Sequence, residues 1–176
     1  MTRQSPEKNE NFDEPSGAQG FFERVAVWLQ ANDLAYADYP YSHYFSLRYT
    51  GEAGEWRVII DVGDGSHGPQ LLIYSYYPIR IPESRRPAVA ELLSRINIAI
   101  WLGCFAMDLR DGEVSIRTSM PVADGEFTDQ QLERLFYANL GLADRHLSGV
   151  CAVAFGNVPP ALAIELGEVP PKEGLQ

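Results

Sequence analysis

Residues 84–120 decide the fold, and they read SRRPAVAELLSRINIAIWLGCFAMDLRDGEVSIRTSM. In the first half of this stretch, apolar residues recur at steps of three and four, which is the spacing of one buried helical stripe. The stripe consists of Val89, Leu92, Leu93, Ile96 and Ile100. Gly103 is expected to end the helix, because glycine adopts the left-handed conformation without a steric cost.

A β-hairpin is predicted directly after this helix. From Cys104 onward the apolar residues alternate with a period of two, and Asp111-Gly112 is a strong signal for a two-residue turn. Folding about that turn pairs Leu109 with Val114, Met107 with Ile116 and Phe105 with Thr118. Asn97 lies beside the helical stripe, and its side chain is expected to bond a neighbouring backbone group.

The composition fits a packed globular domain with an acidic surface. The chain has 176 residues, of which 45% are hydrophobic, and its net charge is −10. This length suits one domain, and the charge argues against binding nucleic acid or an anionic membrane through bulk electrostatics. The densest basic group, formed by Arg80, Arg85 and Arg86, is expected at a solvated helix start.

Cysteine usage and hydropathy predict a cytoplasmic location. Cys104 and Cys151 do not make a disulfide framework and are expected as free thiols. No stretch reaches the ~18 consecutive apolar residues of a membrane helix, and the N-terminus has no apolar signal core.

The chain is expected to divide into a lead, one domain and a tail. Residues 1–17 are polar and acidic, which predicts a flexible lead. Residues 18–156 form the predicted domain. Residues 157–176 form a proline-rich tail, whose middle, ALAIEL, could dock on the body or lie extended.

Within the domain, helices and strands are expected in the order α-βββ-α-ββ-α. The first helix runs from about Ala18 to Asn32-Asp33, and strand-like runs follow at 45–50, 56–61 and 70–77. The closing helix begins at a capping box of Thr128 and Gln131 and continues to about Phe155. This order predicts an α+β fold, with a five-stranded antiparallel sheet and helices packed on it.

No motif in the sequence favours an enzyme, a cofactor or a metal. Residues 63–68 read GDGSHG and match G-x-G-x-x-G, but a proline and another strand follow instead of the helix that a dinucleotide site requires. Asp61, Asp64 and His67 in the same region match neither an EF-hand nor a structural zinc spacing. His146 and Cys151 lie about 140° apart around a helix, too far for a direct catalytic pair.

Tyrosines are the most suggestive feature of the expected surface. They crowd the segment before the first strand and the end of the third, and tyrosine is favoured at protein interfaces because it buries a large area and keeps a polar group. The residues expected to bind a protein partner are Tyr44, Tyr74, Tyr76 and Tyr77. Packing within the domain is the alternative explanation for all of them.

Four segments together resemble the YbjN family of bacterial domains, which are described as regulators of sensory transduction. They are PESRRPAVAELLSRIN, CFAMDLRDGEVSIRTSMPV, FTDQQLERLFYANLGLADRHL and AVAFG, and the resemblance covers roughly residues 18–156. It implies a fold similar to type III secretion chaperones, which are often dimers, so a homodimer is left open. No catalytic residues come with the resemblance.

The expected function is therefore a non-enzymatic regulatory or chaperone-like domain that binds a protein partner. The alternative is a small-ligand sensor or minor enzyme that uses a cavity between the sheet and the C-terminal helix.

Overall fold

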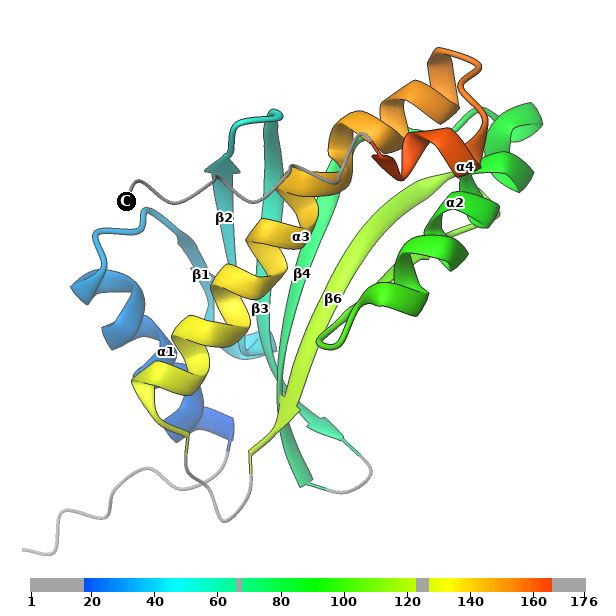
Figure 1. Cartoon of the computed structure of the whole chain (residues 1–176). Helices are drawn as coiled ribbons and strands as arrows, with labels where there is room; N and C mark the ends of the chain where they lie inside the picture. Colours follow the sequence, from blue (N-terminus) through cyan, green and yellow to red (C-terminus); the bar gives the residue numbers. More distant parts are fainter. Residues whose placement is uncertain (1–17, 66–67, 123–126, 166–176) are drawn as a thin grey trace, which may run out of the picture.

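A six-stranded antiparallel sheet carries the helices of the protein on one face (Figure 1). The computed structural model describes residues 18–65, 68–122 and 127–165. The strands are β1 (Ala37–Tyr39), β2 (Tyr44–Thr50), β3 (Glu55–Gly65), β4 (Gly68–Arg80), β5 (Cys104–Met107) and β6 (Glu113–Pro121), in the spatial order β1-β2-β3-β4-β6-β5. The helices are α1 (Ala18–Ala31), α2 (Arg86–Ala99), α3 (Asp129–Phe155) and α4 (Pro160–Ala163), with short 3₁₀ turns η1 (Pro40–Ser42) and η2 (Glu83–Arg85).

The α+β fold with an antiparallel sheet is confirmed, but the prediction of five strands is wrong. The additional strand, β1, pairs with the start of β2, and all three of its residues are exposed. Between the two strands, His43 adopts the left-handed conformation with φ 49°, and the rings of Tyr39 and Tyr44 stack 4.4 Å apart. Only backbone pairing with β2 defines β1. Because none of its three side chains is buried, the sequence has no apolar alternation there that could predict a strand.

Helix α2 confirms the predicted stripe but ends earlier than expected. Its buried residues are Val89, Leu92, Leu93 and Ile96. The helix ends at Ala99, and Ile100 is already extended. Gly103 does have a positive φ, +100°, but it leads into β5, where a Cβ would lie 2.8 Å from the Arg117 carbonyl oxygen. Glycine is therefore required at position 103 because the chain passes close to β6 there, and not because the helix ends there.

The β5–β6 hairpin forms with a register two residues away from the predicted one. Met107 pairs with Val114 and Phe105 with Ile116. The turn is longer because Gly112 packs against the end of β4, where Ile81 donates its N–H to the Gly112 carbonyl at 2.9 Å. An even shift keeps each side chain on its predicted face, but it moves Leu109 out of the ladder into an exposed turn.

Helix α3 begins at the predicted capping box, in which Thr128 and Gln131 satisfy each other's backbone N–H groups. Its apolar stripe packs against β4 and β6. At the centre of this interface, the fully buried Asn139 accepts a hydrogen bond from Ser75, which in turn accepts one from the Trp56 indole. Within the described part of the chain, no buried side-chain nitrogen or oxygen lacks a partner.

The beginning of the expected tail docks on the domain. Helix α4 packs against α2 and α3, and Ala163 is buried. Gly149 allows this approach, because a Cβ there would lie 2.9 Å from the Ala163 carbonyl oxygen. The predicted lead, residues 1–17, and the rest of the tail, residues 166–176, lie outside the described residues.

Arg80, Arg85 and Arg86 lie near the start of α2, as expected, but each side chain also has a partner within the protein. Arg80 pairs with Asp111 and Glu113. Arg85 donates to the Val153 carbonyl, and Arg86 donates to the carbonyls of Ile81 and Leu109. The three side chains tie the start of α2 to β4, α3 and the β5–β6 turn. Cys104 and Cys151 are free, as predicted.

Candidate functional site

The face of the sheet opposite the helices carries two of the predicted tyrosines at its centre. The strand register places Tyr74 between Ile59 and Arg117, and Tyr76 between Arg57 and Ser115. Tyr44 lies on the same face, two strands away, and all three tyrosines are partly exposed. We call the surface formed by Tyr44, Tyr74, Tyr76, Arg57 and Arg117 the tyrosine face.

The side chains of the tyrosine face hold one another in place. The rings of Tyr74 and Tyr76 stack with centroids 5.9 Å apart, and the Arg57 guanidinium lies 4.8 Å from the Tyr76 ring centroid. Arg117 lies beside the Cys104 sulfur and hydrogen-bonds the Tyr74 side chain, and these two neighbours, Cys104 first, raise the pKa of the arginine. Burial, and then the neighbouring Tyr74, raise the pKa of Tyr76 above its ordinary value of 10.0, so its hydroxyl is neutral and can donate a hydrogen bond at neutral pH.

A hollow of about 860 Å³ adjoins one end of the tyrosine face. Arg57, Tyr76 and Arg80 line it from the sheet, and Tyr36 lines it from the connection between α1 and β1. Tyr36 also packs edge-on against Phe45, with ring centroids 5.2 Å apart. The hollow therefore has aromatic walls and charges of both signs, since Glu55 and Glu113 also line it.

Tyr77 does not belong to this surface. It alternates with Tyr76 along β4, so its side chain points to the opposite side of the sheet, toward α3. Only 2% of it is exposed, and its hydroxyl donates to the Ala143 carbonyl at 2.8 Å. Burial raises the pKa of this phenol well above its ordinary value. Tyr77 is a core residue that fastens β4 to α3.

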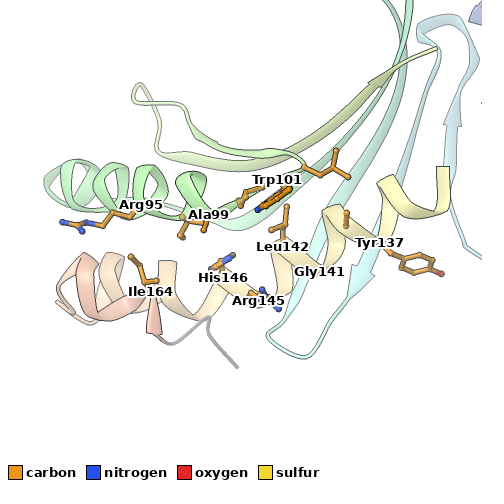
Figure 2. Close-up of a pocket in the computed structure, with 13 residues that line it drawn as sticks. Arg95, Ala99, Trp101, Tyr137, Gly141, Leu142, Arg145, His146 and Ile164 are labelled. Carbon is orange, nitrogen blue, oxygen red and sulfur yellow. The ribbon is translucent and has the colours of Figure 1, made fainter. Parts of the chain in front are cut away.

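A second surface, which the sequence reasoning missed, lies on the helix side of the protein. A groove of about 440 Å³ opens between α2, α3 and α4 (Figure 2). We call it the α2–α3 groove. Among its lining residues are Trp101, Leu142, Gly141, Arg145 and Arg95, which lies on α2 about one turn before Ala99 (Figure 2). The signal in the sequence is a tryptophan that lies off the α2 stripe, two residues before the glycine that leads into β5.

The predicted chemical groups are not brought together into an active site. Asp144 accepts hydrogen bonds from backbone N–H groups of the β2–β3 turn. Two residues further along α3, His146 packs edge-on against Phe105 with ring centroids 5.5 Å apart. Burial first, and then the Arg145 charge, lower the pKa of His146 to about 4. Burial also raises the pKa of the Cys151 thiol, which does not favour a nucleophile.

The glycine-rich segment 63–68 does not have dinucleotide-site geometry, because the chain continues into β4 with Gly65 paired to Gly68. Of the three candidate metal ligands, only Asp61 has a described side chain; burial raises its pKa, and the charge of His43 opposes that shift. The side chain of Asp64 and the whole of His67 lie outside the described residues. Asn97 does bond neighbouring backbone, as predicted: its amide pairs with both the N–H and the carbonyl of Phe105.

Two comparisons place the chain among known proteins, and they agree with the family named from the sequence. A family model described as "YbjN: Putative bacterial sensory transduction regulator" matches residues 22–151. A crystal structure of YbjN, described as a "putative transcription regulator from E. coli", is similar with a TM-score of 0.50 and 17% sequence identity. The similarity covers 71% of this chain and 86% of the other, and it supports the fold. No curated protein matches the chain.

No helix in the described ranges is both long and apolar enough to cross a membrane. Among the described side chains, no three histidine, cysteine, aspartate or glutamate residues cluster in a way that could hold a metal ion.

Proposed function

Because the chain belongs to the YbjN family, whose members are described as regulators of sensory transduction, we propose that it is a regulatory domain that binds a protein partner through the tyrosine face. In this proposal the protein acts by binding and carries out no reaction of its own. The mode is chaperone-like, in that a segment of the partner lies across the open side of the sheet. The proposed location is the cytoplasm.

The observation that supports this proposal is the contrast between the two faces of the sheet. The helix face is packed with buried apolar residues, whereas the opposite face presents partly exposed tyrosines next to arginines. Tyrosine and arginine are enriched among the residues that contribute most to protein–protein affinity. Ring stacking and the Arg57–Tyr76 contact fix these side chains before binding, which lowers the entropy lost in a complex.

A photo-crosslinking experiment tests the proposal. The photoreactive residue p-benzoylphenylalanine replaces Tyr76 in one variant and Tyr41 in another, and the protein is irradiated in its own cells. Tyr41 is a control because it is fully exposed on η1, between strands β1 and β2 at one edge of the sheet, and is not one of the residues that form the tyrosine face. We expect a discrete adduct from position 76 and none from position 41.

The source of the adduct distinguishes a partner from self-association. Its mass and peptides identify either a second protein or another copy of this chain. Tyr74→Ala should reduce the adduct while costing only about 1 kcal/mol of stability, as for a partly exposed residue that loses one ring stack. The same adducts at both positions, or no adduct at position 76, would contradict the proposal. A second copy at position 76 would make the homodimer the occupant of this face.

A further inference from the structure

Trp101 presents its whole indole to solvent at the edge of the α2–α3 groove. Trp101 is fully exposed, whereas Trp28 and Trp56 are 5% and 2% exposed. Leu102, the residue after Trp101, is 43% exposed and also lines the groove. A cluster of large exposed apolar side chains next to a groove marks an interaction surface.

The charges of the groove are of one sign. Arg95 and Arg145 line it, and none of its lining residues is an aspartate or a glutamate. Arg95 pairs with Glu91, which is outside the lining, whereas Arg145 forms no ion pair within the described ranges of the chain. His146, also in the lining, is neutral at pH 7 because burial and Arg145 hold its pKa at about 4. A protein with a net charge of −10 therefore has a local cationic groove.

The floor of the groove has room for a ligand. A Cβ atom placed on Gly141 would meet nothing within 4 Å, so this glycine leaves open space and is not needed for close packing. The groove volume of about 440 Å³ lies in the usual range of binding pockets, roughly 300–1,000 Å³. Its walls are two helices that run side by side (Figure 2), a shape that suits a short peptide segment.

We propose that the α2–α3 groove binds a short acidic, amphipathic segment of another protein. Apolar side chains of that segment pack against Trp101 and Leu142, and a carboxylate pairs with Arg145. A second copy of this chain fits less well, because a two-fold axis at the groove would bring the cationic linings of both copies together without a carboxylate between them. The groove is on the helix side of the sheet, so this site is separate from the tyrosine face.

The probe is a random 12-residue peptide library displayed on phage. It is panned on the full-length protein, with prior depletion on the Trp101→Ala variant. Enriched peptides are synthesised, and their binding is measured by fluorescence anisotropy. Occupancy of the groove is followed independently by acrylamide quenching of tryptophan emission. Because the other two tryptophans are buried, the quenchable emission comes mainly from Trp101 and should be protected by a bound peptide.

Variants separate the apolar, electrostatic and steric parts of the proposal. Trp101→Ala should weaken binding at least about 30-fold, as for a central interface residue. Arg145→Glu should weaken it about tenfold, whereas Arg134→Glu, which reverses an exposed charge on the same helix outside the groove, should leave it within about twofold. Gly141→Leu fills open space on a helix, so it should keep the fold and block binding.

Each outcome decides the proposal. Enriched peptides with carboxylates, dependent on Trp101 and Arg145 but not on Arg134, support it. Three results would overturn it: no Trp101-dependent peptide, peptides without acidic residues, or equal effects of the two charge reversals. A dimer in native mass spectrometry that Trp101→Ala dissociates would also overturn it, since the occupant would then be a second copy.

Discussion

Replacing Asn139 with leucine should destabilise the protein strongly, although leucine has nearly the same size. Asn139 is fully buried between α3 and the sheet and takes part in three hydrogen bonds. Its amide donates to the carbonyls of Ile73 at 3.0 Å and Ile116 at 3.2 Å, on the neighbouring strands β4 and β6. Its oxygen accepts from the Ser75 hydroxyl at 2.6 Å. Leucine removes all three hydrogen bonds and leaves their partners in an apolar interface.

The expected cost is about 3–5 kcal/mol. A buried polar group without a partner costs roughly 1–3 kcal/mol. The carbonyls of Ile73 and Ile116 can still accept backbone hydrogen bonds of the sheet, so the three groups together cost less than three times the largest value. A domain has only about 5–15 kcal/mol of total stability, so the Asn139→Leu variant should unfold at a clearly lower denaturant concentration. Asn32→Leu is the control, because Asn32 is exposed and the hydrogen bond that its side chain donates goes to the Trp28 carbonyl at the end of α1.

Urea unfolding, followed by circular dichroism and tryptophan fluorescence, measures both variants. A double-mutant cycle with Ser75→Ala adds a sharper test. Alone, Ser75→Ala leaves the Trp56 N–H and the Asn139 oxygen unpaired, but in the Asn139→Leu background only the Trp56 N–H is affected. The two changes should therefore couple by at least about 1 kcal/mol. A loss below about 1 kcal/mol for Asn139→Leu, or additive effects, would refute this description of the network.

Other predictions concern the edge of the sheet, one turn and one histidine. Asn97→Ala removes two hydrogen bonds to the Phe105 backbone on the edge strand β5, so it should cost about 1–3 kcal/mol and increase aggregation in light scattering; unchanged aggregation would argue that α2 protects this edge without the amide. Gly112→Ala should prevent stable folding in urea titrations, because the glycine has φ +78° and a Cβ would lie 2.3 Å from the Ile81 carbonyl oxygen; wild-type stability would disprove the close contact. The pKa of His146 is about 4 in the folded protein and 6.5 ordinarily, so the unfolded state binds more protons between these values and stability should fall as the pH drops from 6.5 to 4; His146→Leu should flatten this dependence, and an unchanged slope would count against the assignment.

The candidate surfaces were accessible to sequence reasoning only in part. Clustering of tyrosines pointed to Tyr74 and Tyr76, which do share one face of the sheet. It also pointed to Tyr77, which is in the core. Side chains alternate between the two faces along β4, and the sequence does not show which of the two faces the helices cover. Trp101 was missed because hydrophobic periodicity needs several residues, so the sequence pattern does not show whether one tryptophan between two elements is exposed.

Local patterns in the sequence determined the helices, the antiparallel class of the sheet and the family. The stripe of α2 and the capping box of α3 depend on neighbours within one or two turns, and these interactions are the same in any fold that contains the segment. Tertiary structure alone decided the hairpin register, strand β1 and the two exposed surfaces. These features depend on groups far apart in the chain, such as Gly112 against Ile81 and Tyr77 on Ala143, whose meeting is set by the packing of the whole domain.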